Sequence, residues 1–120
     1  MREIGMGVIE SRFADIVWQK EPIKTKELVA ICDVELNWAR TTTYTVLKRL
    51  CERGIFQTKN SIVTSVLSRD EYYAIQSKRF VDHAFQGSLP AFMAAFSTKT
   101  KLSESEMKEL HQMIDNMAEK

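Results

Sequence analysis

The clearest periodic pattern in the chain lies between residues 37 and 54. Four positions recur at helical spacing and predict an amphipathic helix with one apolar stripe: Thr43, Val46, Leu47 and Leu50. The positions outside this stripe carry hydroxyls, one phenol and cations in place of the usual mixture of Glu and Lys: Thr41, Tyr44, Thr45, Lys48 and Arg49. Gly54 ends the predicted helix, and the apolar pair Ile55 and Phe56 begins an extended segment.

Two helices are predicted before this one and a hairpin after it. The first helix ends near Trp18 and carries an apolar stripe: Ile9, Phe13, Ile16 and Val17. Pro22 stops it, and Ile23 is available for a short extended contact. Thr25 suits the N-cap of the second helix, and residues 33–37 are expected to form a turn; the inward positions of this helix are Leu28, Val29 and Ile31. Residues 56–67 are rich in Thr, Val and Ile around a polar turn at 59–61, which predicts a two-stranded hairpin.

Helical patterns return after Leu67. Ser68 and Glu71 have the spacing of a capping box at the start of one helix, which Gly87 ends. Residues 89–96 form a short apolar helix with Pro90 in its first turn, and residues 97–101 are a polar connector. A second capping-box spacing opens the last helix, whose apolar positions follow at 3-4-3 spacing: Ser103 and Glu106, then Met107, Leu110, Ile114 and Met117.

These C-terminal helices carry more apolar surface than they can bury among themselves. We therefore expect a helical dimerisation domain over residues 68–120, after a first domain over residues 1–67. Ten residues are candidates for the dimer contact: Tyr72, Phe80, Phe85, Leu89, Phe92, Phe96, Met107, Leu110, Ile114 and Met117. The alternative is that the same helices fold back on the N-terminal part of the chain.

Composition favours a globular protein and gives no sign of a membrane protein, a metal site or an enzyme. At 120 residues and 44% hydrophobic content, the chain can form a globular core, and it has neither the apolar run of a membrane span nor a signal peptide. A cytoplasmic protein with reduced cysteines at 32 and 51 is expected. His83 and His111 stand alone, so no metal or other cofactor is expected. The sequence has no recognisable catalytic motif, so we do not expect an enzyme.

Charge singles out the stretch from Arg40 to Lys59. It holds five basic residues and one acidic residue, a local charge of +4, whereas the whole chain carries +1. Hydroxyls, a phenol and cations are groups that hydrogen-bond to base edges and phosphates. The predicted DNA contacts are Arg40, Thr41, Thr42, Tyr44, Thr45, Lys48, Arg49 and Lys59. The alternatives are an ordinary solvated helix end, or a protein interaction module whose partner is acidic.

An ordered set of residues along nearly the whole chain resembles one known family, the penicillinase and methicillin-resistance repressors of the BlaI/MecI/CopY type. The matching positions are Ile9–Trp18, Ile23, Thr25, Trp38, Thr42, Thr45, Leu47, Arg49, Leu50, Gly54, Glu71, Tyr72, Ser77, Phe80, Phe85, Gly87, Ser88, Leu89, Phe96, Leu102, Ser103 and Glu106. The resemblance implies a mainly α fold with a small β-hairpin wing: a winged helix-turn-helix domain followed by a C-terminal helical dimerisation domain. It also implies a homodimeric repressor that binds inverted-repeat DNA operators, such as those of beta-lactam-resistance genes.

The chain departs from the family pattern in three places. Its wing is about four residues shorter than usual. Thr41 and Tyr44 stand where family members more often carry Lys and Gln, so the family's operator sequence does not transfer. In the beta-lactam systems a sensor protease relieves repression at an Asn-Phe bond, and the matching bond here is Ala95–Phe96. Two possibilities stay open: cleavage there, or an ordinary interhelical connector with release by a ligand, a partner or dilution.

Overall fold

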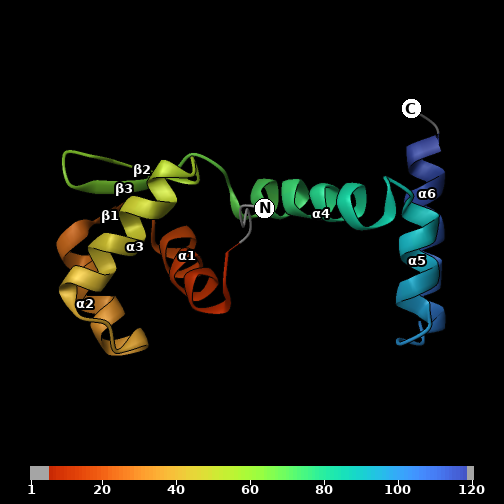
Figure 1. Ribbon diagram of the computed structural model, residues 1–120, viewed down its shortest axis with the longest axis horizontal. Helices are drawn as coiled ribbons and strands as arrows, with labels where there is room; N and C mark the ends of the chain where they lie inside the picture. The colour runs from red at the N-terminus through yellow and green to blue at the C-terminus, as the bar shows by residue number, and fades with distance from the viewer. Residues whose placement is uncertain (1–5, 119–120) are drawn as a thin grey trace. The chain divides into compact units, whose positions relative to one another are not determined.

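The computed structural model describes residues 6–118 and divides the chain into two compact units, Met1–Ser77 and Lys78–Lys120. The signal-peptide expectation concerns residues 1–5, which lie outside the described part. The predicted boundary at 67/68 stays a prediction. The elements, shown in Figure 1, are α1 (Val8–Lys20), β1 (Ile23–Lys24), α2 (Thr25–Leu36), α3 (Arg40–Glu52), β2 (Phe56–Lys59), β3 (Ile62–Ser65), α4 (Arg69–Phe85), α5 (Leu89–Ser97) and α6 (Glu104–Ala118).

The core of the first unit is built from the apolar stripes of α1, α2 and α3 and from the sheet. Its most deeply buried large side chains are Phe13, Val17, Leu28, Leu50, Phe56 and Val63. Trp18 packs against Phe56 and donates its indole N–H to the Leu67 carbonyl at 2.9 Å. Trp38 stacks on Phe13 with ring centroids 5.6 Å apart. Both tryptophans therefore anchor the core, as aromatic residues with a large apolar area commonly do.

Three local details differ from the sequence-based expectations. Ile9 is exposed, because the first turn of α1 extends past the buried stripe that begins at Phe13. Helix α2 continues through residues 33–36, where a turn was expected, and ends at Asn37 in the left-handed conformation with φ 56°. Its N-cap is Lys24, so Thr25 is the first helical residue. The longer helix is explained by Leu36, which packs against the core one turn after fully buried Cys32.

The sheet has three antiparallel strands in the order β1-β3-β2. Ile23 pairs with Val63, and Phe56 pairs with Ser65, so the predicted hairpin and the extended contact of Ile23 are confirmed. The two turn residues Asn60 and Ser61 both have positive φ, which is the requirement of the type I′ turn that suits the twist of a hairpin. This turn fixes the reach of the wing.

Both predicted capping boxes form. Ser68 and Glu71 exchange hydrogen bonds of 2.8 and 3.0 Å at the start of α4, and Ser103 and Glu106 do so at 3.1 Å before α6. Gly87 follows α4 with φ 81°, a conformation that favours glycine. In the second unit four phenylalanines form a chain of ring contacts on α4 and α5: Phe80, Phe85, Phe92 and Phe96.

Candidate nucleic-acid interface

Helix α3 presents its polar face to solvent because its opposite face is locked into the core. All four residues of the predicted stripe are buried: Thr43, Val46, Leu47 and Leu50. The predicted DNA contacts on the other face are exposed, apart from half-buried Tyr44: Arg40, Thr41, Thr42, Tyr44, Thr45, Lys48 and Arg49. The helix is therefore rigidly held while its hydroxyls and cations remain available, which is the arrangement of a groove-binding helix.

Tyr44 is held by two neighbours. The Arg40 guanidinium carbon lies 5.6 Å from the centre of the Tyr44 ring, within cation–π range. A hydrogen bond with the Thr25 side chain, assisted by the charges of Arg40 and Lys26, lowers the pKa of the Tyr44 phenol from its ordinary value. The Tyr44 ring therefore lies against Arg40, with the Thr25 side chain close by. Sequence reasoning missed Thr25, because a contact between the first residue of α2 and the middle of α3 leaves no local signal.

A shallow open hollow lies beside Tyr44, between α3, the start of α2 and β2. Its lining is Thr25, Tyr44, Leu47, Lys48, Cys51 and Thr58. The Cys51 sulfur lies 3.7 Å from the Thr58 hydroxyl, and neither cysteine forms a disulfide. The free thiols agree with the sequence-based expectation, and burial raises the pKa of Cys32.

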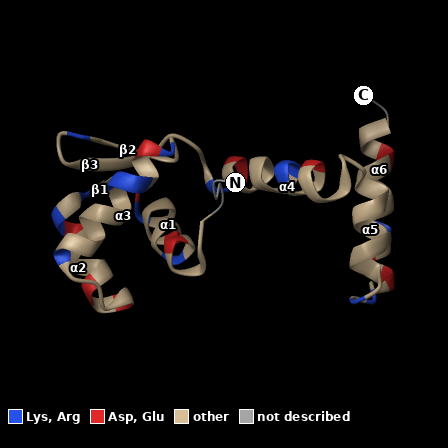
Figure 2. Cartoon of the chain, viewed as in Figure 1, with Lys and Arg blue, Asp and Glu red and all other residues tan. Residues whose placement is uncertain are grey.

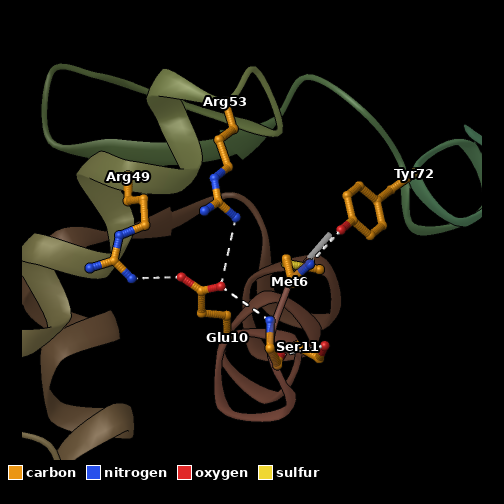
Figure 3. Close-up of polar contacts among 7 residues, drawn as sticks. Met6, Glu10, Ser11, Arg49, Arg53 and Tyr72 are labelled. Carbon is orange, nitrogen blue, oxygen red and sulfur yellow. Dashed lines mark hydrogen bonds and ion pairs between the residues drawn. The ribbon is translucent and has the colours of Figure 1, made fainter. Parts of the chain in front are cut away.

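The C-terminal half of α3 is tied to α1 by a carboxylate that sequence reasoning also missed. Glu10 Oε2 accepts from Arg49 Nη1 at 2.7 Å, and Glu10 Oε1 lies 3.7 Å from Arg53 Nη1 (Figure 3). Burial alone would raise the pKa of Glu10, but the hydrogen bonds from Arg49 and the Gly7 N–H and the charge of Arg53 outweigh it and lower the pKa. The spacing of Glu10 from Gly7 signals a helix start, and nothing in the sequence links it to Arg49.

Lys59, the last predicted DNA contact, is exposed at the end of β2 beside the turn. Figure 2 shows the basic residues of α3 and of the hairpin in the first unit. The predicted contacts thus come from two elements of one unit, the helix and the wing. Their roles toward DNA stay predictions.

The predicted dimer residues fall into two groups. Tyr72 belongs to the core of the first unit, where its hydroxyl accepts from the Met6 N–H at 3.0 Å and burial raises its pKa. The other nine are half-buried or exposed in the second unit: Phe80, Phe85, Leu89, Phe92, Phe96, Met107, Leu110, Ile114 and Met117. Helices α5 and α6 contain no buried residue over the described range.

The bond between Ala95 and Phe96 lies in the last turn of α5, not in the polar connector. The Ala95 carbonyl accepts from the Thr98 N–H, and the Phe96 carbonyl accepts from Lys99 and Thr100. Both residues are exposed, yet the backbone around the bond is helical. Proteolysis there would require local opening of the helix end.

Within residues 6–118, no helix has the length and apolar character needed to cross a membrane. In the same range, no group of three or more His, Cys, Asp or Glu side chains is arranged to hold a metal ion.

Comparison with known proteins identifies the family of this chain. The family model described as penicillinase repressor matches residues 6–116. The penicillinase repressor of Bacillus licheniformis is 23% identical over 104 residues, covering 83% of this chain and 81% of that protein. The methicillin resistance regulatory protein MecI of Staphylococcus aureus is 24% identical over 110 residues, covering 88% of this chain and 89% of that protein. MecI of Mammaliicoccus sciuri is 23% identical over 105 residues, covering 84% of this chain and 85% of that protein. The chain therefore belongs to the penicillinase repressor family of transcriptional regulators.

Proposed function

We propose that the protein is a homodimeric repressor that binds an inverted-repeat DNA operator, with α3 of each protomer in a major groove. The observation that carries the proposal is the division of α3 into a fully buried apolar stripe and an exposed face of hydroxyls and cations. A dimer fits this function, because two-fold protein symmetry matches two half-sites. Repression then follows from occupation of the promoter.

We infer the role of each residue toward DNA from its position on α3 or on the hairpin. Arg40, Thr41, Thr42, Tyr44 and Thr45 occupy the N-terminal half, where recognition helices usually reach base edges. Tyr44 is the strongest candidate for reading a base edge, because its ring already lies against the Arg40 guanidinium. The remaining cations, Lys48, Arg49 and Lys59, are placed for phosphates, which position the protein without reading sequence.

The dimer contact is proposed for the exposed apolar side chains of the second unit. Phe80, Leu89, Phe96, Met107, Ile114 and Met117 are all at least two-fifths exposed. Many exposed large apolar side chains within one unit are typical of an interaction site. Tyr72 is left out of the proposed contact because the first unit already covers it.

The test begins by selecting bound duplexes from a random pool and measuring affinity across a salt series. Specific, steeply salt-dependent binding of an inverted repeat is expected, because bound cations release counterions from the phosphates. Lys48→Ala should make the slope shallower by about 1, whereas Lys99→Ala, which changes another exposed lysine in the second unit, should leave it unchanged.

A protein that binds no duplex in a salt-dependent way, while capturing an acidic protein through the same face of α3, would establish the alternative of a protein interaction module. For the targets, the names of the relatives point to resistance genes of the beta-lactam type. A footprint on the DNA flanking the protein's own gene tests that assignment directly.

A further inference from the structure

Glu10 lies beneath the C-terminal end of α3, between two arginines. Figure 3 shows its carboxylate with one oxygen on Arg49 and the other facing Arg53 and the α1 backbone. The second oxygen also accepts the Gly7 N–H at 3.2 Å. Every carboxylate oxygen therefore has a defined donor, so the side chain has one orientation.

The exposures of the pair show which partner faces solvent. The Glu10 side chain is 17% exposed, whereas that of Arg49 is 48% exposed. Arg49 gives Glu10 one hydrogen bond through Nη1, and a guanidinium has five N–H donors in a planar fork. The carboxylate is thus mostly covered, whereas about half of the Arg49 side chain is exposed and Glu10 uses one of its N–H donors.

The first turn of α1, which carries Glu10, is itself held by hydrogen bonds. The Met6 N–H donates to the Tyr72 hydroxyl at 3.0 Å, and the Ser11 hydroxyl donates to the Gly7 carbonyl at 2.9 Å. These bonds hold the first turn of α1, from which Glu10 projects (Figure 3). A carboxylate on a fixed support restricts the arginine that it binds.

We propose that Glu10 is a positioning residue for DNA binding: it orients Arg49 so that the outer N–H groups of the guanidinium meet a backbone phosphate. The inference rests on the proposed function and adds to it a residue of α1 that does not itself touch DNA. A long side chain that is already ordered loses less conformational entropy when it binds. Competition by Glu10 for the arginine is disfavoured because Arg49 can engage both anions at once through different N–H groups.

The experiment compares Glu10→Gln with Asp15→Asn in the full chain. Asp15 is the matched control because it lies on the same helix, is half-exposed, and pairs with Arg69 at 3.0 Å, away from α3. Both variants remove one negative charge, so general electrostatic effects cancel between them. The probe is a random-sequence duplex, since a phosphate contact is independent of sequence.

Glu10→Gln should bind the duplex about fivefold more weakly than Asp15→Asn at 0.15 M salt, with a salt slope shallower by about 1, which is the value of one released counterion. In an Arg49→Ala background the same change should have no further effect, because the residue through which Glu10 acts is gone. Thermal unfolding of both variants checks that they are folded.

Binding by Glu10→Gln that equals or exceeds that of Asp15→Asn would overturn the inference. So would a loss with an unchanged slope, or a loss that persists in the Arg49→Ala background, because either would indicate a structural role alone. Failure of the proposed function has a different signature: the unaltered protein would then bind no duplex in a salt-dependent way, and both ideas would fall together.

Discussion

Replacing Ile114 by alanine should weaken the dimer strongly while leaving each chain folded. The side chain lies on α6 and is 60% exposed, beside Met107, Leu110 and His111 in a shallow apolar hollow. Because so much of it is open to solvent within one chain, its removal should have little effect on the folding of that chain. Its apolar area becomes important only when a second chain covers it.

The size of the effect follows from the exposed fraction. Isoleucine to alanine removes three carbons, about 2.4 kcal/mol of transfer free energy at about 0.8 kcal/mol each, when the whole side chain moves from water to an apolar surface. With 60% of the side chain open for burial by a partner, the loss is about 1.4 kcal/mol per protomer and about 2.9 kcal/mol per two-fold dimer. The dimer dissociation constant should then rise about 100-fold.

Sedimentation velocity across a protein concentration series measures this constant. Val34→Ala is the matched control, since Val34 on α2 is an aliphatic residue that is 84% exposed and lies in the first unit. Its removal should leave the dimer unchanged. Equal dissociation constants for Ile114→Ala and the unaltered protein would refute the assignment of α6 to the dimer contact, and an equal loss for Val34→Ala would refute its location in the second unit.

Four other outcomes are expected. Tyr44→Ala should reduce the preference for the selected operator over random DNA by about 1 to 3 kcal/mol, and equal losses on both duplexes would contradict base reading. Thr43→Val should leave the urea unfolding free energy equal or higher, because the Thr43 hydroxyl is buried without a hydrogen-bond partner among the described residues. The stability that Glu10 contributes should be fully present above its unfolded pKa and be lost as pH falls through its lower folded pKa. The difference in urea unfolding free energy between Glu10→Gln and the unaltered protein should therefore begin to shrink as pH falls below about 4.5. Limited proteolysis should cut first within residues 98–103 and not at the helical Ala95–Phe96 bond, as read by mass spectrometry.

Local patterns allowed much of the fold to be predicted. Both capping boxes and the stripe of α3 depend on residues within a few positions of one another, and the hairpin depends on its turn. The end of α2 was predicted too early, because the turn-forming character of Asp33 was outweighed by packing of Leu36 against the core and by the left-handed conformation that Asn37 adopts after it. Burial, rather than propensity, decided where that helix ends.

Only the residues on the exposed face of α3 could be predicted as part of the candidate site. The outer face of α3 follows from helical periodicity alone, since the residues opposite a buried stripe must face outward. The contacts that support this face do not follow from periodicity. Glu10 binds Arg49, which is 39 positions away in the sequence, and Thr25 lies near Tyr44 but belongs to another helix. Such contacts depend on how helices pack together, which a single sequence does not reveal.

The two-residue turn of the hairpin has a consequence for how this protein can change. Asn60 and Ser61 are exposed and stand between Lys59 and Ile62, which are exposed as well, so no buried side chain constrains the length of the loop. The Thr25 N–H donates to the Ser61 carbonyl at 2.9 Å and so ties the loop to the start of α2. Extending it from two residues to about six would cost only about 1 kcal/mol of loop-closure entropy. The wing can therefore change length at a small cost in stability as long as the hydrogen bond from Thr25 is kept. Operator preference can then diverge there among descendants while the helices remain the same.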